Sequence, residues 1–525
     1  MTTSLRTDDK AVTEVELKLH IPKASAGEVT AWLRSRGARS ERLRARYFDS
    51  INRDLAKAKM ALRLRYERGR WVQTLKAATA GPMTRFEHEV AVQRGQPDAP
   101  PPLAPSLHQA TEVRPLLAKA LELASPEGLA AQFETDIRRT STLYRSRRGQ
   151  VEISLDIGSI SAPGCDALPV CEIEIELATG SPLAVTDVAR QVVRRFSAWI
   201  DPATKAERGH GLAARQPRVA AVRAGPVHLA PSAGLAECAL AVLRECRRQM
   251  LPNLAALASE HDHQPEHVHQ ARVALRRLRS AIRLFQYAPL LGLDAKAQAL
   301  SRALGECRKR DVLLESVAPQ LSKAGAPTTE LAVLSQTADA RGITRRRESQ
   351  ALLLELIERE LELDIAPPNS TESAAPQLIA RLTDWHRKVR RDARQFEALD
   401  DERRHQLRRR MKRLRYGIEF CRSLCSDKRY RRMLRSLSEA QETLGRYNDL
   451  VEALAGYRAQ ADQDPRAWFA VGWLTAEIQA QLLRCQAALA ALRRCDPPWR
   501  PLHQSRPGGE PPKHTAKPPT LIPSP

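Results

Sequence analysis

Residues 14–18 read E-V-E-L-K, so Glu14, Glu16 and Lys18 alternate with two apolar residues. In a β-strand this spacing places the charged side chains on one face and the apolar ones on the other. Carboxylates bind hard divalent cations, and ammonium groups form charge-assisted hydrogen bonds with phosphate. The segment therefore fits either a strand with one solvated face or the wall of a charged cavity.

Later segments repeat the alternation with both signs of charge. The residues that share a charged or polar face are Arg63 and Arg65; Thr74 and Lys76; Arg85, Glu87 and Glu89; Glu152 and Asp156; and Glu172, Glu174 and Glu176. Taken singly, each strand fits a sheet with one wet face. Together they favour a closed barrel, because like charges on neighbouring positions repel and two opposite groups facing each other would be neutralised. A polyphosphate carried on Mg²⁺ would satisfy both groups.

The pentapeptide at 14–18 resembles the E-x-E-x-K signature of the CYTH superfamily, the triphosphate tunnel metalloenzymes. Further motifs follow in the family's order: Y-F-D at 47–49, L-R-L-R at 62–65, T-L-K at 74–76, R-F-E-H-E at 85–89, L-D-I-G at 155–158, E-I-E-L at 174–177 and T-K-A-E-R-G at 204–209. The resemblance covers residues 10–212. It implies an eight-stranded antiparallel β-tunnel with flanking helices that hydrolyses or cyclises triphosphate substrates with a divalent metal, Mg²⁺ or Mn²⁺.

Carried over residue by residue, the resemblance implies a catalytic set of carboxylates and cations. The metal-binding carboxylates would be Glu14, Glu16, Glu174 and Glu176. The phosphate-binding cations would be Lys18, Arg63, Arg65, Lys76, Arg85, Lys205 and Arg208. Phosphoryl transfer depends on positioning and on stabilising spread negative charge, which such a set supplies. The general base stays open between Lys18 and a water on the metal, and Glu87, Glu89, Glu152 and Asp156 fit either a direct role or a supporting one.

In the C-terminal half, one basic helical segment occurs twice. H-Q-A-R-V-A-L-R-R-L-R at 269–279 aligns without gaps with H-Q-L-R-R-R-M-K-R-L-R at 405–415. At about 100° per residue, each copy places its cations along one side of an amphipathic helix. These cationic stripes are His269, Arg272, Arg276 and Arg279 in the first copy and His405, Arg408, Lys412 and Arg415 in the second. One stripe would fit a solvated helix face, whereas two copies favour a docked anion, because neighbouring cations repel.

The repeated stripe, with Tyr416 and L-G-x-x-N-D at 444–449, resembles the CHAD domain, the conserved-histidine α-helical domain, over 235–495. The resemblance implies two pseudo-symmetric four-helix bundles, at about 235–363 and 377–495, and polyphosphate binding by the stripe residues. In R-K-R-D-V at 308–312, Lys309 departs from the family pattern, because an acidic residue is common there. In H-D-H-Q-P-E-H-V-H at 261–269, Pro265 predicts a helix start, which favours a cap over a histidine metal site.

The elements that must position these residues change type at a proline-containing linker, residues 213–234. Before the linker, period-2 segments predict strands at 12–20, 60–66, 70–77, 85–92, 151–157 and 171–177, with helices near 25–36, 112–123 and 182–198. After it, helical spacing continues to 495, interrupted by a proline-rich stretch at 364–376. The expected architecture is multidomain, α+β followed by all-α, and the proline-rich tail at 496–525 is predicted to be disordered.

Charge and composition agree with an anionic partner. The 525 residues include 84 Lys plus Arg against 61 Asp plus Glu, a formal net charge of +23, which predicts a polyanionic partner. Aromatic residues make up only 4%, which disfavours binding by base stacking, and nucleic acid is not the expected partner. The sequence shows no apolar leader and no bilayer-spanning run, and its nine cysteines are scattered. A cytoplasmic protein, associated with polyphosphate granules, is expected.

The leading functional expectation is a metal-dependent inorganic triphosphatase or polyphosphatase whose helical domain binds polyphosphate or tripolyphosphate. A tunnel enzyme acting on thiamine triphosphate, on a nucleoside triphosphate, or on ATP as an adenylate cyclase stays open. A non-catalytic polyphosphate-granule binding protein also stays open, although the intact carboxylate motifs argue against it. The sequence leaves the choice of metal, the chain-length preference and a homo-oligomeric state open.

Overall fold

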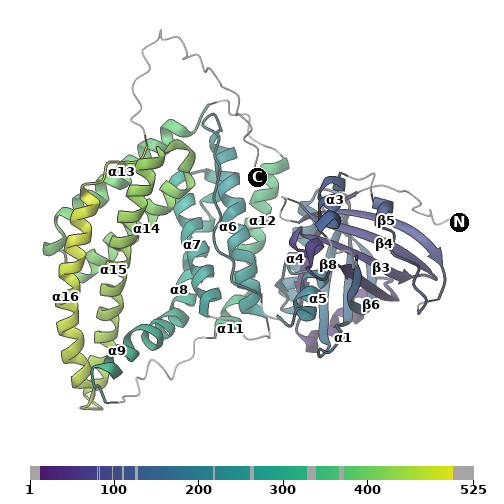
Figure 1. The fold of residues 1–525 in the computed structure, drawn as a ribbon, viewed down its shortest axis with the longest axis horizontal. Helices are drawn as coiled ribbons and strands as arrows, with labels where there is room; N and C mark the ends of the chain where they lie inside the picture. Colours follow the sequence, from purple (N-terminus) through teal and green to yellow (C-terminus); the bar gives the residue numbers. More distant parts are fainter. Residues whose placement is uncertain are drawn as a thin grey trace, which may run out of the picture.

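The computed structural model describes residues 12–79, 81, 83–96, 98–108, 112–123, 128–216, 219–259, 265–327, 339–365 and 372–499. The side chains of Val12, Gln93, Arg94 and residues 308–312, 314 and 315 are not described. The predicted tail lies outside this part of the chain from position 500 onward. Figure 1 shows a β-rich region at one end of the molecule and a helical region at the other.

Eight strands of the N-terminal region form a closed antiparallel barrel. They are β1 (Val12–His20), β2 (Arg39–Asp49), β3 (Met60–Glu67), β4 (Arg70–Ala78), β5 (Thr84–Arg94), β6 (Ala130–Ser146), β7 (Gly149–Ser161) and β8 (Leu168–Gly180). Their order is β5-β4-β3-β2-β6-β7-β8-β1, and β1 pairs with β5 to close the ring. A two-residue strand, β9 (Trp199–Ile200), pairs with the end of β1. The expected eight-stranded tunnel is thus confirmed.

In β1, β3, β5, β7 and β8 the alternation is inverted relative to an ordinary wet sheet, because the charged face points into the barrel. In β1, Leu17 and Leu19 are buried on the outside, in the same hydrophobic core as Val185 and Val188 of α4 (Leu183–Phe196). Glu16 of the same strand faces inward. The helices α1 (Ala26–Arg34), α3 (Arg114–Leu123) and α4 supply the apolar cover that these outward side chains need.

Strands β2 and β6 are not predicted by the period-2 pattern. Their outward positions carry charges that pair across the two strands, as between Arg46 and Glu134 at 2.8 Å. Their inward positions are partly apolar, because Tyr47 stacks on Phe133 with ring centroids 4.5 Å apart. Strands β2 and β6 therefore place charged side chains outside the barrel and partly apolar side chains inside it, opposite to the arrangement in β1, β3, β5, β7 and β8. The pattern also misses α5 (Lys205–Ala213), a helix that begins with a capping box between Thr204 and Glu207.

The helical region is built around two four-helix groups, and in the first group α9 (Ala318–Lys323) and α11 (Ala340–Arg345) lie between the third and fourth helix. The first contains α6 (Leu235–Ala258), α7 (Pro265–Phe285), α8 (Leu293–Val312) and α12 (Arg347–Ile365); the second contains α13 (Ala375–Arg394), α14 (Asp401–Phe420), α15 (Asp427–Ala461) and α16 (Ala467–Arg493). Each group closes a ring of contacts, and α7 meets α14 between the groups. The two predicted bundles are confirmed. Helix α7 begins at Pro265 as predicted.

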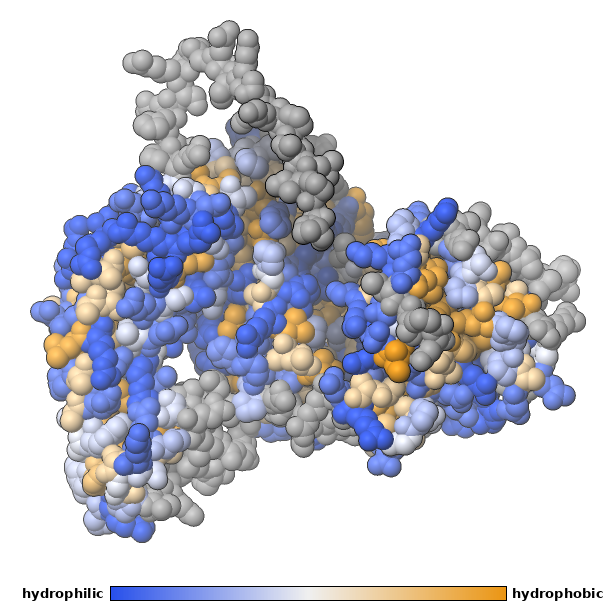
Figure 2. All heavy atoms as spheres, viewed as in Figure 1, coloured by the Kyte–Doolittle hydropathy of each residue, from blue (hydrophilic) through white to orange (hydrophobic). Residues whose placement is uncertain are grey.

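The faces opposite the cationic stripes are buried, as the amphipathic pattern predicts. Leu275 and Leu278 of α7, and Leu407 and Leu414 of α14, are fully buried. Figure 2 shows a mainly hydrophilic visible face over the helical region. None of the described helices has the length and apolar character needed to cross a membrane.

The β-rich and helical regions are packed against each other. Helix α4 lies beside α12 (Figure 1), and Arg190 of α4 donates to both carboxylate oxygens of Glu358 at 2.7 Å. The short helix α11 (Ala340–Arg345) precedes α12 and also reaches this interface. One hydrophobic core runs continuously from the barrel's outer wall into the bundles. The two regions therefore pack as a unit.

Candidate functional site

The barrel encloses a cavity of about 1250 Å³ that collects almost all of the predicted catalytic residues. Its lining includes Glu14, Glu16, Lys18, Arg63, Arg65, Lys76, Arg85, Glu174, Glu176 and Lys205. Arg208 does not line the cavity and instead forms an ion pair with the buried Glu172. The volume suits a small polar ligand with its hydration. The strand alternation has thus brought residues from β1, β3, β4, β5 and β8 to one place.

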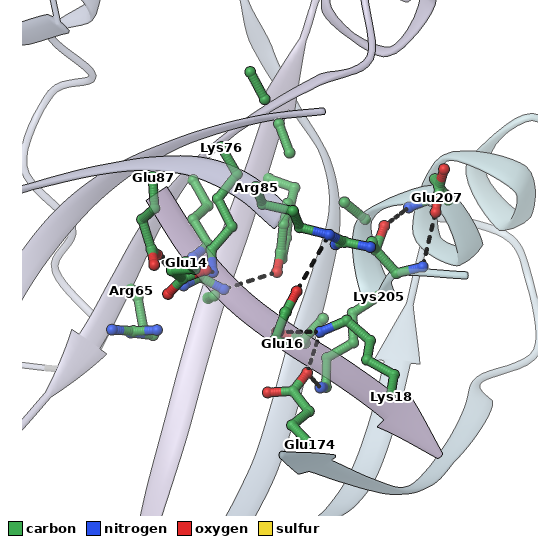
Figure 3. Close-up of a pocket in the computed structure, with 18 of the residues that line it drawn as sticks. Glu14, Glu16, Lys18, Arg65, Lys76, Arg85, Glu87, Glu174, Lys205 and Glu207 are labelled. Atoms are coloured by element: carbon green, nitrogen blue, oxygen red, sulfur yellow. Dashed lines mark hydrogen bonds and ion pairs between the residues drawn. The ribbon is translucent and has the colours of Figure 1, made fainter. Parts of the chain in front are cut away.

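Two buried ammonium groups meet at Glu174. Lys18 Nζ donates to Glu16 Oε2 at 2.8 Å and to Glu174 Oε1 at 2.7 Å. Lys205 Nζ lies 2.9 Å from the same Glu174 oxygen and 2.6 Å from Asp156 Oδ2. Figure 3 shows both amines converging on Glu174. This arrangement holds two cations side by side in the cavity wall.

The carboxylates around these amines keep their charge despite burial. Burial alone would raise the pKa of Glu174, but Lys18, Lys205 and Arg139 hold that pKa well below its usual range. Burial would lower the pKa of Lys18, but Glu16 and Glu174 raise it. Both partners are therefore charged at neutral pH, and the cavity is electrostatically organised before any ligand enters.

A second set of cations lies farther along the cavity. Lys76 Nζ donates to Glu14 Oε2 at 2.8 Å and lies 3.0 Å from Glu87 Oε1. Arg65 Nη2 donates to Glu89 Oε1 at 3.0 Å. The charges along this wall alternate in sign. When a polyanion binds, its phosphate oxygens would replace the carboxylates as partners of these cations. Such a wall can follow an extended phosphate chain.

A cluster of carboxylates around Glu176 carries more negative charge than the neighbouring cations balance. Burial, followed by Glu14, Glu152 and Glu16, raises the pKa of Glu176 to about 7. Glu176 lies directly across the sheet from Glu16 and from Glu152. Glu16 Oε1 is buried without a hydrogen bond, although Arg85 Nε lies 3.2 Å away. Crowded carboxylates with spare oxygens fit a hard divalent cation.

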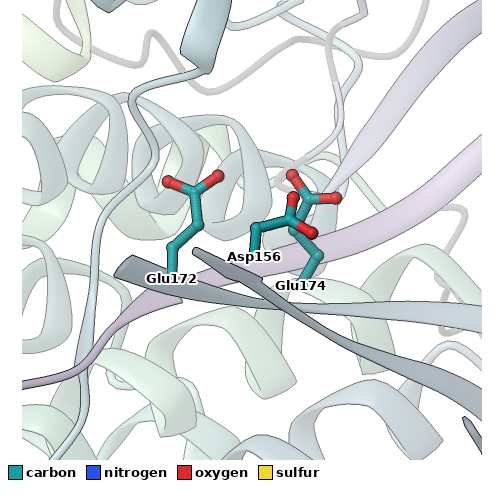
Figure 4. A group of neighbouring side chains, drawn as sticks. All are labelled: Asp156, Glu172 and Glu174. Atoms are coloured by element: carbon teal, nitrogen blue, oxygen red, sulfur yellow. The ribbon is translucent and has the colours of Figure 1, made fainter. Parts of the chain in front are cut away.

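A tighter acidic group, Asp156, Glu172 and Glu174, brings one oxygen from each residue within 4.8 Å of the others (Figure 4). Each of these carboxylates already has a basic partner. Lys205 contacts all three, and Arg139 donates to Asp156 at 2.7 Å and also to Glu174. This group therefore fixes cations in the wall more readily than it would hold a metal.

A second cavity, of about 900 Å³, lies in the helical region between α7, α14 and α15. We call it the basin. The stripe residues that line it are His269, Arg276, Arg408, Lys412 and Arg415. Residues 223–228 of the linker form part of its rim. The two copies of the basic helix thus contribute to one shared cavity, which neither copy reveals alone.

The basin gathers cations, although the carboxylates Glu419, Glu442 and Asp449 also line it. Burial lowers the pKa of Lys412 well below its usual value, and Arg276, Arg408 and Arg272 lower it further. Burial and then Arg276 also lower the pKa of Arg408, against the opposite influence of Asp449. Among the described residues, Lys412 makes no ion pair. Such a cluster is stable only because the surrounding fold enforces it, and an anion would relieve it.

Two protein-family models match the regions of the chain that contain most of these cavity residues. A model of the CYTH domain matches residues 13–209, and a model of the CHAD domain matches residues 241–457. The chain joins a CYTH domain to a CHAD domain. The tunnel cavity is lined mainly by residues of the CYTH domain, with Leu251 of the CHAD domain added. The basin is lined mainly by residues of the CHAD domain, with linker residues 223–228 at its rim.

Individual relatives match parts of the chain. An inorganic triphosphatase of Haemophilus influenzae is 29% identical over 173 residues, 32% of this chain and 46% of that protein, so the match spans about half of the relative's length. The crystal structure of a CHAD domain from the plant Ricinus communis is 31% identical and covers 53% of this chain and 98% of its own, with a TM-score of 0.45. A Hippeastrum protein, described as a candidate adenylyl cyclase with a dominant triphosphatase activity, is 19% identical over 38% of this chain and 95% of its own, with a TM-score of 0.28.

Sequence reasoning misses Arg139, a tunnel cation that pairs with Asp156 and Glu174. It also misses basic residues elsewhere in the cavity lining: Arg53, Lys57, Lys59, Arg68 and Arg70. Arg139 lies on β6 in the same inward row as Phe133, Thr135 and Ile137. The signal is present as period-2 spacing, but the row is mostly uncharged, so the pattern does not mark β6 as a tunnel strand. Glu172, which pairs with Arg208, shares the charged face of β8 with Glu174 but is not among the predicted site residues.

In the CHAD domain the stripes are less uniform than predicted. Arg279 does not line the basin, because its Nε donates to Asp294 on α8 at 2.8 Å, which corrects the expectation of an uncompensated stripe. Arg415 lines the basin but pairs with Glu419 at 2.8 Å. Arg272 donates to the Leu304 carbonyl at 3.2 Å. These partners come from other turns or helices, so a single helical wheel could not reveal them.

The histidines of the CHAD domain make contacts with protein groups. His405 Nδ1 lies 3.1 Å from Asn448 Oδ1. His267 Nε2 lies 2.9 Å from the Val219 carbonyl, which agrees with a structural role instead of metal binding. His263 lies outside the described residues, and so does the side chain of Lys309.

Proposed function

We propose that the CYTH domain is a metal-dependent inorganic triphosphatase that hydrolyses phosphoanhydride bonds, and that the CHAD domain binds polyphosphate. The observation that carries the proposal is the barrel cavity in which Lys18, Lys205 and Arg139 are held as cations by carboxylates, beside a Glu16 oxygen that is buried without a hydrogen bond. The Haemophilus relative, which is called an inorganic triphosphatase, supports the choice of substrate.

The chain's own residues bind and orient the substrate. Lys18, Lys205 and Arg139 at one end of the cavity, and Lys76 and Arg65 at the other, would contact successive phosphates. Because their positions are fixed by ion pairs before binding, little reorganisation is needed as negative charge shifts toward the leaving phosphate. The closed strand ring limits the access of bulk water and strengthens each contact.

The carboxylates Glu14, Glu16, Glu174 and Glu176 would hold Mg²⁺ or Mn²⁺. Glu16 and Glu176 fit this role best, since they are crowded and Glu16 has a buried oxygen without a hydrogen bond. The metal would neutralise phosphate oxygens and polarise the bond that is cleaved. Glu174 would at the same time keep Lys18 and Lys205 in place.

The basin would bind a polyphosphate chain through charge-assisted hydrogen bonds from Arg276, Arg408 and Lys412. A polymer held there stays near the tunnel on the same molecule, which raises its local concentration. Association with polyphosphate granules would follow from this binding.

Phosphate release by the full-length protein tests the proposal. Tripolyphosphate, long-chain polyphosphate, ATP and thiamine triphosphate are compared with Mg²⁺, with Mn²⁺ and with a chelator, and cAMP is measured in the ATP reaction. We expect tripolyphosphate to give the highest kcat/KM and the chelator to abolish release. A higher kcat/KM for thiamine triphosphate or ATP would identify that compound as the substrate in place of tripolyphosphate. No phosphate release from any compound would favour a non-catalytic binding protein.

A further inference from the structure

A short segment of the CYTH domain, residues 199–204, contacts both the tunnel wall and the CHAD domain, and we call it the strap. It begins with β9, which extends the barrel by pairing Ile200 with Leu19 and Trp199 with His20 of β1. It ends at Thr204, whose side chain caps α5. The strap therefore touches both the strand that carries Glu16 and Lys18 and the helix that carries Lys205.

On the tunnel side, the strap is connected to three cavity cations: to the main chain of Lys18, to the guanidinium of Arg85, and directly along the chain to Lys205. The Asp201 amide donates to the Lys18 carbonyl at 3.1 Å. Arg85 Nη2 donates to the Pro202 carbonyl at 3.3 Å. The capped first turn of α5 starts at Lys205, whose amine lies among Asp156, Glu172 and Glu174. A shift of the strap would move these groups together.

On the CHAD side, two residues at the junction of α11 and α12 hold the strap. The Ile200 amide donates to Gln350 Oε1 at 2.8 Å, and Gln350 Nε2 donates to the Thr344 carbonyl at 2.8 Å. The Arg345 guanidinium lies 3.7 Å from the centre of the Trp199 ring, and Arg345 Nε donates to the Ala258 carbonyl at 2.7 Å. Trp199, Ile200 and Gln350 are all buried, so water does not substitute for these contacts.

We propose that Gln350 and Arg345 of the CHAD domain are positioning residues for the triphosphate site of the CYTH domain. They fix the strap, and the strap fixes the main chain of Lys18 and the start of the helix that presents Lys205. The CHAD domain is then a structural part of the tunnel's phosphate site as well as a binding domain. The inference rests on the proposed function, because it assigns these residues an effect on triphosphate binding.

The same interface offers a matched control. Arg190 Nη2 donates to both carboxylate oxygens of Glu358 between α4 and α12, and within the described part of the chain neither residue makes a hydrogen bond or ion pair with the strap. Glu358→Ala therefore weakens domain packing without loosening the strap. A general loss of folded protein lowers the apparent kcat and leaves KM unchanged, whereas a misplaced phosphate contact raises KM.

The test compares Gln350→Met, Arg345→Met and Glu358→Ala in the full-length protein. Two readouts are used: KM and kcat for tripolyphosphate, and hydrogen exchange of amides in residues 199–213. We expect Gln350→Met and Arg345→Met to raise KM about tenfold, because small displacements of positioned groups have large effects. Both should speed exchange in the strap and α5, while Glu358→Ala should change neither quantity.

The outcomes separate this inference from the proposed function. If the wild-type protein cleaves tripolyphosphate and KM is unchanged in Gln350→Met and Arg345→Met, the positioning role is wrong and the triphosphatase proposal stands. If the wild type cleaves no phosphate compound, the triphosphatase proposal fails, and the positioning of a triphosphate site fails with it. Unchanged exchange in residues 199–213 would overturn the inference whatever the activity, as would equal effects in Glu358→Ala.

Discussion

Replacing Lys412 by methionine should stabilise the protein and weaken its binding of polyphosphate at the same time. Lys412 is largely buried, is repelled by Arg272, Arg276 and Arg408 more than it is attracted by Asp449, and has no ion pair among the described residues. Methionine keeps an unbranched apolar side chain of similar length and removes the ammonium group. The two effects have opposite signs only if the charge is kept for a ligand instead of for the fold.

The magnitudes follow from burial and charge. Burying a charge without a close partner costs free energy, so we expect the methionine variant to gain about 0.5–2 kcal/mol, as single stabilising substitutions commonly do. Each phosphate interaction that the substitution removes from a flexible polyanion should reduce the slope of log K against log salt by about 0.7. Because burial depresses the pKa of Lys412 in the folded protein, the stabilisation should be full below that pKa and disappear as pH approaches the ordinary lysine value.

Thermal unfolding without polyphosphate and retention on immobilised long-chain polyphosphate at several salt concentrations measure the two effects. Lys388→Met is the matched control, because Lys388 is half-exposed on α13 and pairs with Asp384 at 2.7 Å. It should change stability by no more than about 0.5 kcal/mol and leave retention unaltered. If Lys412→Met lowers the melting temperature, or binds polyphosphate as the wild type does, the basin is not an anion site.

Three further predictions concern separate parts of the molecule. Arg139→Ala should lower kcat/KM for tripolyphosphate by roughly 10²-fold, while Arg138→Ala, the neighbour on the barrel's exposed outer face, should leave it unchanged; equal kinetics in the two variants would remove Arg139 from the site. Gly445→Ala should weaken polyphosphate retention, because its new Cβ would lie 3.0 Å from Arg408 Nη2. Gly456→Ala has no neighbouring atom within 4 Å and should only stabilise α15, by about 1 kcal/mol, so a similar drop in retention there would contradict the reasoning. Burial, and then Arg390, lower the pKa of His386 to about 4, while Asp496 acts in the opposite direction. The protein should therefore lose up to about 3 kcal/mol of stability as the pH falls from 6.5 to 4. His386→Gln should flatten that dependence in denaturant unfolding, and an unchanged pH profile would show that His386 does not titrate in this way.

The sequence predicts the tunnel where charge alternation is strong and fails where it is mixed. Strands β1 and β8 are identifiable because three acidic or basic residues share one inward face, as in Glu172, Glu174 and Glu176. Strands β2 and β6 carry charges on the outward face, where they pair with each other. Alternation alone cannot say which face is inside, so it does not single out Arg139, although the strand partner of Arg139, Asp156, stands out in the pattern.

In the CHAD domain, the helical wheel predicts the correct faces but not their partners. The buried positions Leu275, Leu407 and Leu414 follow from 3.6-residue spacing. The capture of Arg279 by Asp294, and the approach of Arg276 to Lys412, depend on how helices pack in space. The strap contacts of Gln350 and Arg345 are of the same kind, because residues more than a hundred positions apart meet there.

The central claim is tested most directly by phosphate release from tripolyphosphate in the presence of Mg²⁺, comparing the wild type with Glu16→Gln. This substitution keeps the shape of the side chain and removes the charge of the carboxylate that pairs with Lys18 and crowds Glu176. Glu134→Gln is the control, since Glu134 pairs with Arg46 on the outer face of the barrel. The account predicts that the wild type and Glu134→Gln release phosphate at similar rates and that Glu16→Gln is slower by about 10²-fold or more. Equal rates in all three proteins, or no release by the wild type, would contradict it.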